Sequence, residues 1–280
     1  MPRSMARIGL CFWIILSTLA LRYQELAVLG ICAIDPVDGH VDIPSSWDSI
    51  PEFAFDDCAA LSTVNIPSSI HSIGMMAFDN CTSLTSLDIP DSVISIGLRA
   101  FSECTSLKSV TLGEQVKTLG DSVFSGCFLL TVVDLPDSLL SIPEMAFRNC
   151  WNLESFIVPD GVKTIGSGAF ENCSSLQVVT MGQSVVAIES YAFHECFALQ
   201  SLSLSESVVT IGWFSFSYAK LKSITFGKNV REVGDFAFAF NFDLSRVEIK
   251  SPHITFNDSV FSNCYSLVAS SQIFITKQAE

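Results

Sequence analysis

Ten cysteines are the residues best suited to covalent or metal chemistry in this chain of 280 residues. Eight of them recur at one place in a repeated pattern: Cys58, Cys81, Cys104, Cys127, Cys150, Cys173, Cys196 and Cys264. Such a set could form disulfides, bind a metal or line up as buried thiols. If the repeats stack, neighbouring cysteines come within disulfide reach. Seven consecutive side chains that point the same way cannot all pair, however.

Two repeats carry Ala219 and Asn241 where the others carry cysteine. A position that accepts Cys, Ala or Asn requires a small buried side chain, and an Asn there can hydrogen bond to turn backbone. The sequence therefore favours buried free thiols, with scattered disulfides as the alternative. A metal site is least favoured, because none of the four histidines stands at ligand spacing from the cysteines. We expect no cofactor.

Catalytic and nucleic-acid functions have little support in the sequence. An enzyme would need a nucleophile beside a base, or a pair of carboxylates, in a pocket. The Ser and Asp residues here follow the repeat instead, so we expect no enzyme activity. The chain has 29 acidic and 15 basic residues, a net charge of −14. An acidic chain repels phosphate backbones and anionic lipids, which disfavours nucleic-acid binding and electrostatic docking to membranes.

The elements that position the cysteines follow from a repeat of phenylalanine. Phe recurs in steps of 23 residues, with one step of 22, at positions 55, 78, 101, 124, 147, 170, 193, 216, 238 and 261. Leu follows six residues after most of these phenylalanines. Phe216 and Leu221 are only five apart, so one residue is missing around residues 218–220. A fixed period of this length is typical of a solenoid.

One unit, residues 84–104, shows how each coil is built. Leu84, Leu87 and Ile89 give the alternation of a short strand with one buried face. Pro90 ends the strand and Gly97 opens a turn. A single unit cannot bury its apolar face, but stacked units form a continuous core. The sequence therefore predicts a solenoid with a parallel β-sheet of short strands on one face and turns and 3-10 segments on the other.

The string Ile-Pro, Val, Ile-Gly, Ala-Phe, Cys and Leu recurs in register over residues 41 to about 267. This pattern resembles the BspA-type leucine-rich repeats, a class with 23-residue units. The resemblance implies a leucine-rich-repeat solenoid of about ten coils over residues 41–280, with a lead-in over residues 21–40. It also implies export and a role in adhesion or partner binding, and it brings no catalytic residues.

The first 20 residues have the order of a secretory signal peptide. Arg3 and Arg7 precede an uncharged apolar run from residue 8 to residue 21, which is short for a membrane span. An uncleaved signal anchor is the alternative, because a second apolar stretch follows. We therefore expect a secreted or cell-surface protein, in contact with a membrane only if this segment is an anchor.

Two groups of residues that depart from the repeat are candidate partner-binding sites. Val132, Ile157 and Val178 stand at outward strand positions that are mostly small and polar elsewhere. They form an apolar patch or are there for β-propensity alone. Aromatic residues that follow the repeat cysteine form the second group, of which Phe128, Trp151 and Phe197 are the candidates. These rings either contact protein or sugar or fold over the edge of their own coil.

Three sequons make Asn80, Asn172 and Asn257 candidate N-glycosylation sites, and Asn257 is the best placed because the other two adjoin buried cysteines. Extra aromatic residues in the eighth and ninth repeats, such as Phe214 and Phe236, either widen the core or mark a contact surface. The leading functional hypothesis is a binding module for a protein or a cell-surface glycan. The alternative is an envelope or matrix protein that assembles through the ends of its solenoid.

Overall fold

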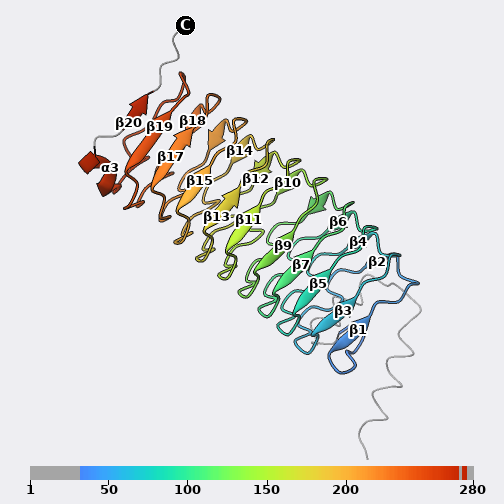
Figure 1. Cartoon of the computed structure of the whole chain (residues 1–280). Coiled ribbons are helices and arrows are strands. Elements are labelled where there is room, and N and C mark those ends of the chain that lie inside the picture. Colours follow the sequence, from blue (N-terminus) through green and yellow to red (C-terminus); the bar gives the residue numbers. More distant parts are fainter. Residues whose placement is uncertain (1–31, 271–272, 276–280) are drawn as a thin grey trace, which may run out of the picture.

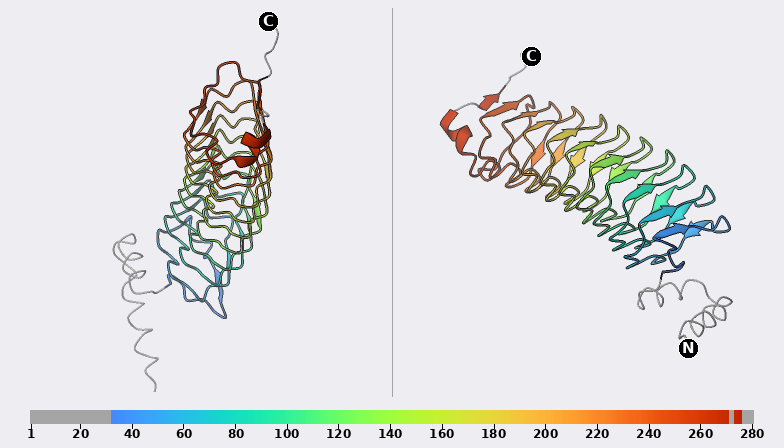
Figure 2. Two further views of the ribbon diagram at one scale, coloured as in Figure 1. Left: turned by 90° about the vertical axis from the view of Figure 1, so that its left-hand side faces the viewer. Right: turned by 60° about the horizontal axis from the view of Figure 1, so that its bottom comes forward.

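The computed structural model describes residues 32–270 and 273–275, which form a solenoid of about nine turns. The coils stack into an arc (Figure 2), with a core that runs along its whole length. The fold is that predicted from the repeat. The proposed signal segment, residues 1–20, lies outside the described residues. In the part of the chain that is described, no helix has the length and apolar character needed to cross a membrane.

The front face carries short parallel strands, one to a coil (Figure 1). Central residues of these strands point inward and their neighbours outward, as the alternation predicts. Neighbouring strands pair in a register of 23 residues, so that Val41 lies beside Val64. The front strands are β1 (His40–Asp42), β3 (Thr63–Asn65), β5 (Ser86–Asp88), β7 (Ser109–Thr111), β9 (Val132–Asp134), β11 (Ser155–Ile157), β13 (Val178–Thr180), β15 (Ser201–Ser203), β17 (Ser223–Phe226), β19 (Arg246–Ile249) and β20 (Ile273–Ile275).

A second face, which we call the back, carries a ladder of two-residue strands that the sequence did not predict. A glycine follows most of them, and Gly97 N–H donates to the Ile73 carbonyl of the previous coil at 2.9 Å. A Cβ on Gly97 would meet backbone of that coil, so the close approach requires glycine. The back strands are β2 (Ser49–Ile50), β4 (Ser72–Ile73), β6 (Ser95–Ile96), β8 (Thr118–Leu119), β10 (Ser141–Ile142), β12 (Thr164–Ile165), β14 (Ala187–Ile188), β16 (Thr210–Ile211) and β18 (Glu232–Val233).

The third face is made of turns, without a 3-10 helix among the described residues. Backbone bonds also join the coils here, as between Phe78 N–H and the Ala100 carbonyl at 2.8 Å. In most coils the residues two before and two after the repeat Phe have positive φ, for example Met76 at 52° and Asn80 at 57°. A short helix, α3 (Tyr265–Ser270), lies at the C-terminal end of the solenoid.

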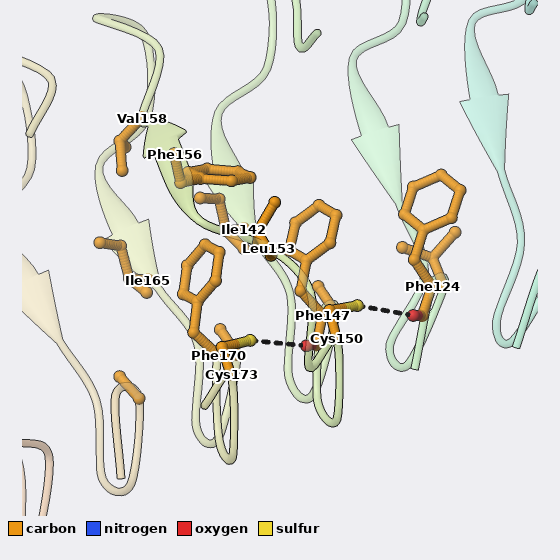
Figure 3. Packing of buried hydrophobic residues seen from close by; sticks show 14 of the residues in the cluster. Phe124, Ile142, Phe147, Cys150, Leu153, Phe156, Val158, Ile165, Phe170 and Cys173 are labelled. Carbon is orange, nitrogen blue, oxygen red and sulfur yellow. Dashed lines mark hydrogen bonds between the residues drawn. The ribbon is translucent and has the colours of Figure 1, made fainter. Parts of the chain in front are cut away.

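Columns of identical residues fill the interior. The repeat phenylalanines from Phe55 to Phe238 are fully buried, and those from Phe55 to Phe216 stack with ring centroids 5.0–5.6 Å apart. Each buried thiol donates to the carbonyl of the Phe in the preceding coil, as Cys150 does to Phe124 at 3.4 Å and Cys173 to Phe147 at 3.1 Å (Figure 3). The cysteines are therefore packing residues that also satisfy a buried carbonyl.

In the coil that lacks one residue, the Asn241 side chain supplies a hydrogen bond that the regular turn would make. In a regular coil the Leu N–H donates to the carbonyl of the repeat Cys, as Leu84 does to Cys81 at 3.0 Å. In the short coil Leu221 N–H donates instead to Asn241 Oδ1 at 3.1 Å. The Asn241 amide donates to the Phe216 and Phe238 carbonyls at 2.8 and 2.9 Å. The predicted hydrogen bonding of a buried Asn to turn backbone is confirmed.

Candidate binding surface

The back ladder is interrupted in the middle of the solenoid, between β8 and β10. Pro143 stands there in the place that glycine holds in most coils. Proline has no N–H to donate to the previous coil, and its ring adds bulk where neighbouring coils approach most closely. The third face stays continuous at this point, because Phe124 N–H donates to the Ala146 carbonyl at 2.9 Å. The coils therefore separate on one face only.

The front ladder is interrupted in three places, between β3 and β5, between β9 and β11 and between β15 and β17. The second of these lies one coil beyond the interruption of the back ladder. No backbone hydrogen bond joins residues 131–135 to residues 154–158, all of which are described. Phe156 occupies the inward strand position that a smaller aliphatic side chain fills in other coils, and its ring lies 4.6 Å from that of Phe170 (Figure 3). Val133 and Leu135, which point inward, are partly exposed here. We call this opening between β9 and β11 the front seam.

The three strand residues expected to form an apolar patch lie around the front seam. Val132 is 58% exposed, Ile157 is 72% exposed and Val178 is 49% exposed. Val132 and Val178 belong to the row of first strand positions, on either side of Ser155, whereas Ile157 belongs to the row of third positions beside Thr180. The three residues thus alternate between two rows on three successive strands.

Two of the three candidate aromatic residues meet at the same place. Phe128 and Trp151, in the turns before β9 and β11, stack with centroids 4.2 Å apart and planes 6° from parallel. Asn152 N–H donates to the Phe128 carbonyl at 3.2 Å, so the two coils remain joined in this turn. Phe197 is also exposed but lies two coils beyond Trp151. The stack closes one end of the front seam.

The cysteines offer no reactive thiol among the described residues. Seven are free and buried: Cys81, Cys104, Cys127, Cys150, Cys173, Cys196 and Cys264. Burial raises the pKa of each thiol, to about 11 for Cys264 and further for the others. A thiol that stays protonated is a poor nucleophile and a poor metal ligand.

Cys58 is the exception to the predicted column of free thiols, because it forms a disulfide with Cys32. These residues are 26 apart, the same separation as between each other repeat Cys and the Phe carbonyl that accepts its S–H bond. Cys58 belongs to the first coil, where no earlier repeat Phe supplies a carbonyl. The lead-in supplies a sulfur at that place and is thereby fixed to the end of the core.

A serine, a histidine and a glutamate lie together on the third face. His194 Nδ1 is 2.6 Å from Ser217 Oγ, and His194 Nε2 is 3.7 Å from Glu195 Oε1. Burial lowers the pKa of His194. Ser217 is fully buried and its hydroxyl donates to the Phe214 carbonyl at 3.0 Å. The hydroxyl cannot reach a substrate, so this group stabilises the turn.

The extra aromatic residues of the eighth and ninth repeats lie on the turns of the third face, outside the buried core. They occupy left-handed backbone positions that hold small, polar or flexible residues in most coils. Tyr191, Phe214 and Phe236 stack at 5.3 and 4.9 Å, and Tyr218 and Phe240 stack at 4.3 Å. Of the two alternatives from the sequence, these rings extend the surface rather than widen the core.

The three sequon asparagines differ in exposure. Asn80 and Asn257 are exposed, and their amides donate to Asp57 and Asp235, each at 2.6 Å. Asn172 is partly buried and donates to Asn149 at 2.9 Å. Its amide nitrogen is the least accessible of the three for a modification.

The sequence model of the BspA-type leucine-rich repeat region matches residues 39–154 and 140–268. The chain belongs to this family. Its repeats form the leucine-rich-repeat solenoid that typically serves as a non-enzymatic scaffold. Among curated proteins, none matches the sequence.

Solved structures of bacterial leucine-rich-repeat proteins are similar to this chain. One from Bacteroides ovatus is 30% identical over 81% of this chain and 53% of its own, with a TM-score of 0.63. The leucine-rich-repeat protein of T. pallidum is 35% identical over 58% of this chain and 78% of its own, with a TM-score of 0.54. A third, from Eubacterium ventriosum, is 23% identical with a TM-score of 0.55 and shows the fold alone. The chain spans about half the length of the B. ovatus protein.

Proposed function

We propose that this chain is a non-catalytic binding module that contacts a protein partner through the front seam. The observation that carries the proposal is that Val132 and Ile157 lie exposed on the two strands of the front seam, with Val178 exposed on the next strand, β13. Strand propensity accounts for a β-branched residue at any outward position. It does not account for three such residues in three successive coils at and beside the front seam.

The chemistry of the front seam suits a protein surface. The facing edges of β9 and β11 are not paired with each other, and strand edges without a ladder partner can bond to an extended segment. The exposed aliphatic side chains supply apolar area at the centre, and polar residues such as Asp134 and Thr180 lie beside them. An apolar centre with a polar rim is the usual anatomy of a protein interface. A glycan partner would instead need a dense set of hydrogen-bonding side chains.

We further propose that the module acts outside the cell or on its surface, in adhesion. A disulfide between Cys32 and Cys58 supports this, because such bonds persist in oxidising compartments.

The test is a quantitative pull-down from the native surroundings with Val132, Ile157 and Val178 all changed to Ser. We expect the captured protein to fall at least tenfold. The matched control is Leu140→Ser, which removes an aliphatic side chain that is 59% exposed next to β10 on the back, and it should capture as much as the unchanged chain. Equal capture by the triple variant would refute the proposal. Assembly through the ends would appear as concentration-dependent growth of the purified chain in sedimentation.

A further inference from the structure

A depression of about 570 Å³ lies over β14, β16 and β18, away from the front seam. Its wall includes Trp213, which is 61% exposed, together with the carboxylates of Glu189 and Glu232. Ser167, Ser190 and Thr210 are the other polar residues of the lining. Aliphatic residues of the three strands also line the depression.

Trp213, Glu189 and Glu232 each depart from the repeat. Glu189 stands where most coils have glycine after the back strand. Glu232 stands in a column that is otherwise Ser, Thr or Ala, and Trp213 in one that holds no other aromatic residue. The solenoid fold requires none of them. They come from three successive coils and line the same depression.

Local contacts hold the indole and one carboxylate in place. Trp213 N–H donates to Ser190 Oγ at 3.3 Å, which fixes the backbone of the turn. The indole lies against Gly234 of the next coil, where a Cβ would collide with Trp213 Cδ1. Glu189 Oε2 accepts from Ser167 N–H at 3.1 Å. These contacts preorganise an aromatic wall beside a negative charge.

The carboxylates have no cationic partner among the residues that the structure describes. Neither Glu189 nor Glu232 takes part in an ion pair within residues 32–270. Two uncompensated negative charges and the face of an indole attract the same kind of group, an ammonium or a guanidinium. The net charge of −14 adds to this attraction at long range. A neutral sugar would gain nothing from the excess charge.

We propose that the Trp213 depression binds a lysine or arginine side chain of a protein partner. The depression lies on another face than the front seam. The binding proposed for it does not depend on whether the front seam binds a partner. It gives the module a second, charge-selective contact.

The test uses ¹⁵N-labelled protein and follows the indole N–H signal of Trp213, assigned by its loss in Trp213→Phe. The probe is the peptide acetyl-Gly-Arg-Gly-amide, and its control is the same peptide with citrulline, which has the shape of arginine without the charge. We expect a saturable shift with the arginine peptide at millimolar concentrations, weakened by added salt. The citrulline peptide should cause at most a tenth of that shift.

Two substitutions locate the charge. Glu189→Gln and Glu232→Gln should each weaken binding at least threefold, whereas Glu154→Gln, an exposed carboxylate before β11, should leave it unchanged. An unmoved Trp213 signal, or an equal shift with citrulline, would overturn the proposal. So would a saturable shift with a neutral trisaccharide in place of the arginine peptide, since that outcome assigns the depression to carbohydrate.

Discussion

The hydrogen bonds of Asn241 in the short coil predict how much Asn241→Ala lowers the free energy of unfolding. The substitution removes three buried hydrogen bonds: the two amide donations and the bond from Leu221 N–H. The two amide donations are worth about 1 kcal/mol each net, and the Leu221 N–H left unpaired in the core costs about 1–3 kcal/mol. We therefore expect a loss of about 3–5 kcal/mol in the free energy of unfolding.

Two comparisons separate hydrogen bonding from volume. Asn241→Cys restores the residue that most coils have, and its thiol can donate to the Phe216 carbonyl, but Leu221 N–H stays unpaired. It should lose about 1–3 kcal/mol. Cys150→Ala, in a regular coil, removes one weak bond and a small volume and should lose about 1 kcal/mol.

The assay is urea unfolding followed by far-UV circular dichroism, with amide hydrogen exchange as a local readout. Exchange of Leu221 N–H should accelerate in both Asn241 variants and stay unchanged in Cys150→Ala. A loss below about 1 kcal/mol in Asn241→Ala, or unchanged exchange at Leu221, would show that the missing residue is accommodated by backbone relaxation instead.

Three further predictions follow from burial and close approach. Thiol reagents should leave the seven buried cysteines unmodified in the native chain and label them in urea; rapid labelling of the folded protein would contradict the column of protonated thiols. Burial and the neighbouring Asp57 raise the pKa of Asp56 to about 6; its proton binds more tightly in the folded state, so stability should fall as the pH rises from about 4 to about 6. Asp56→Asn should flatten that dependence in urea titrations, by about 1–2 kcal/mol after solvent screening. Gly120→Ala should cost more than about 2 kcal/mol because its Cβ would meet Leu98 backbone. Gly227→Ala should cost about 1 kcal/mol or less in thermal unfolding, because its Cβ would come within 3.2 Å only of the Glu206 carboxylate, the end of a flexible side chain, and would meet Glu206 backbone at ordinary contact.

The columns of the core could be predicted from the sequence because period and burial are linked. A residue type that recurs every 23 positions must face the same neighbours, so the Phe, Leu and Cys columns followed directly. The outward position of Val132 and Ile157 followed from the same alternation and is confirmed. Residues that depart from the repeat were harder, because their outcome depends on contacts between coils.

The disulfide of Cys58 is such a case, since the lead-in has no periodicity that places Cys32. The interruption at Pro143 was visible as a proline in a column of glycines, but the back ladder that gives this column its meaning was not predicted. Phe214 lies on the surface in a turn where its backbone is left-handed. The sequence gives no sign of this conformation, because bulky residues rarely have positive φ. The Trp213 depression combines three columns, and only the stacked coils bring them together.

Departures from the repeat thus fall into two kinds, and the difference bears on function. Cys32 bonds to the sulfur of Cys58, which has no earlier repeat Phe carbonyl as a partner, and Asn241 accepts from Leu221 N–H in the short coil. Stability alone explains both residues. Ile157 and Trp213 satisfy no buried polar group, and each leaves most of a large apolar side chain exposed. Exposed apolar residues that stand singly, such as Leu140, are common on protein surfaces, whereas those that gather beside an interruption or in a depression are candidates for contact with a partner. By this criterion the front seam and the Trp213 depression are where changes should alter binding while leaving the fold intact.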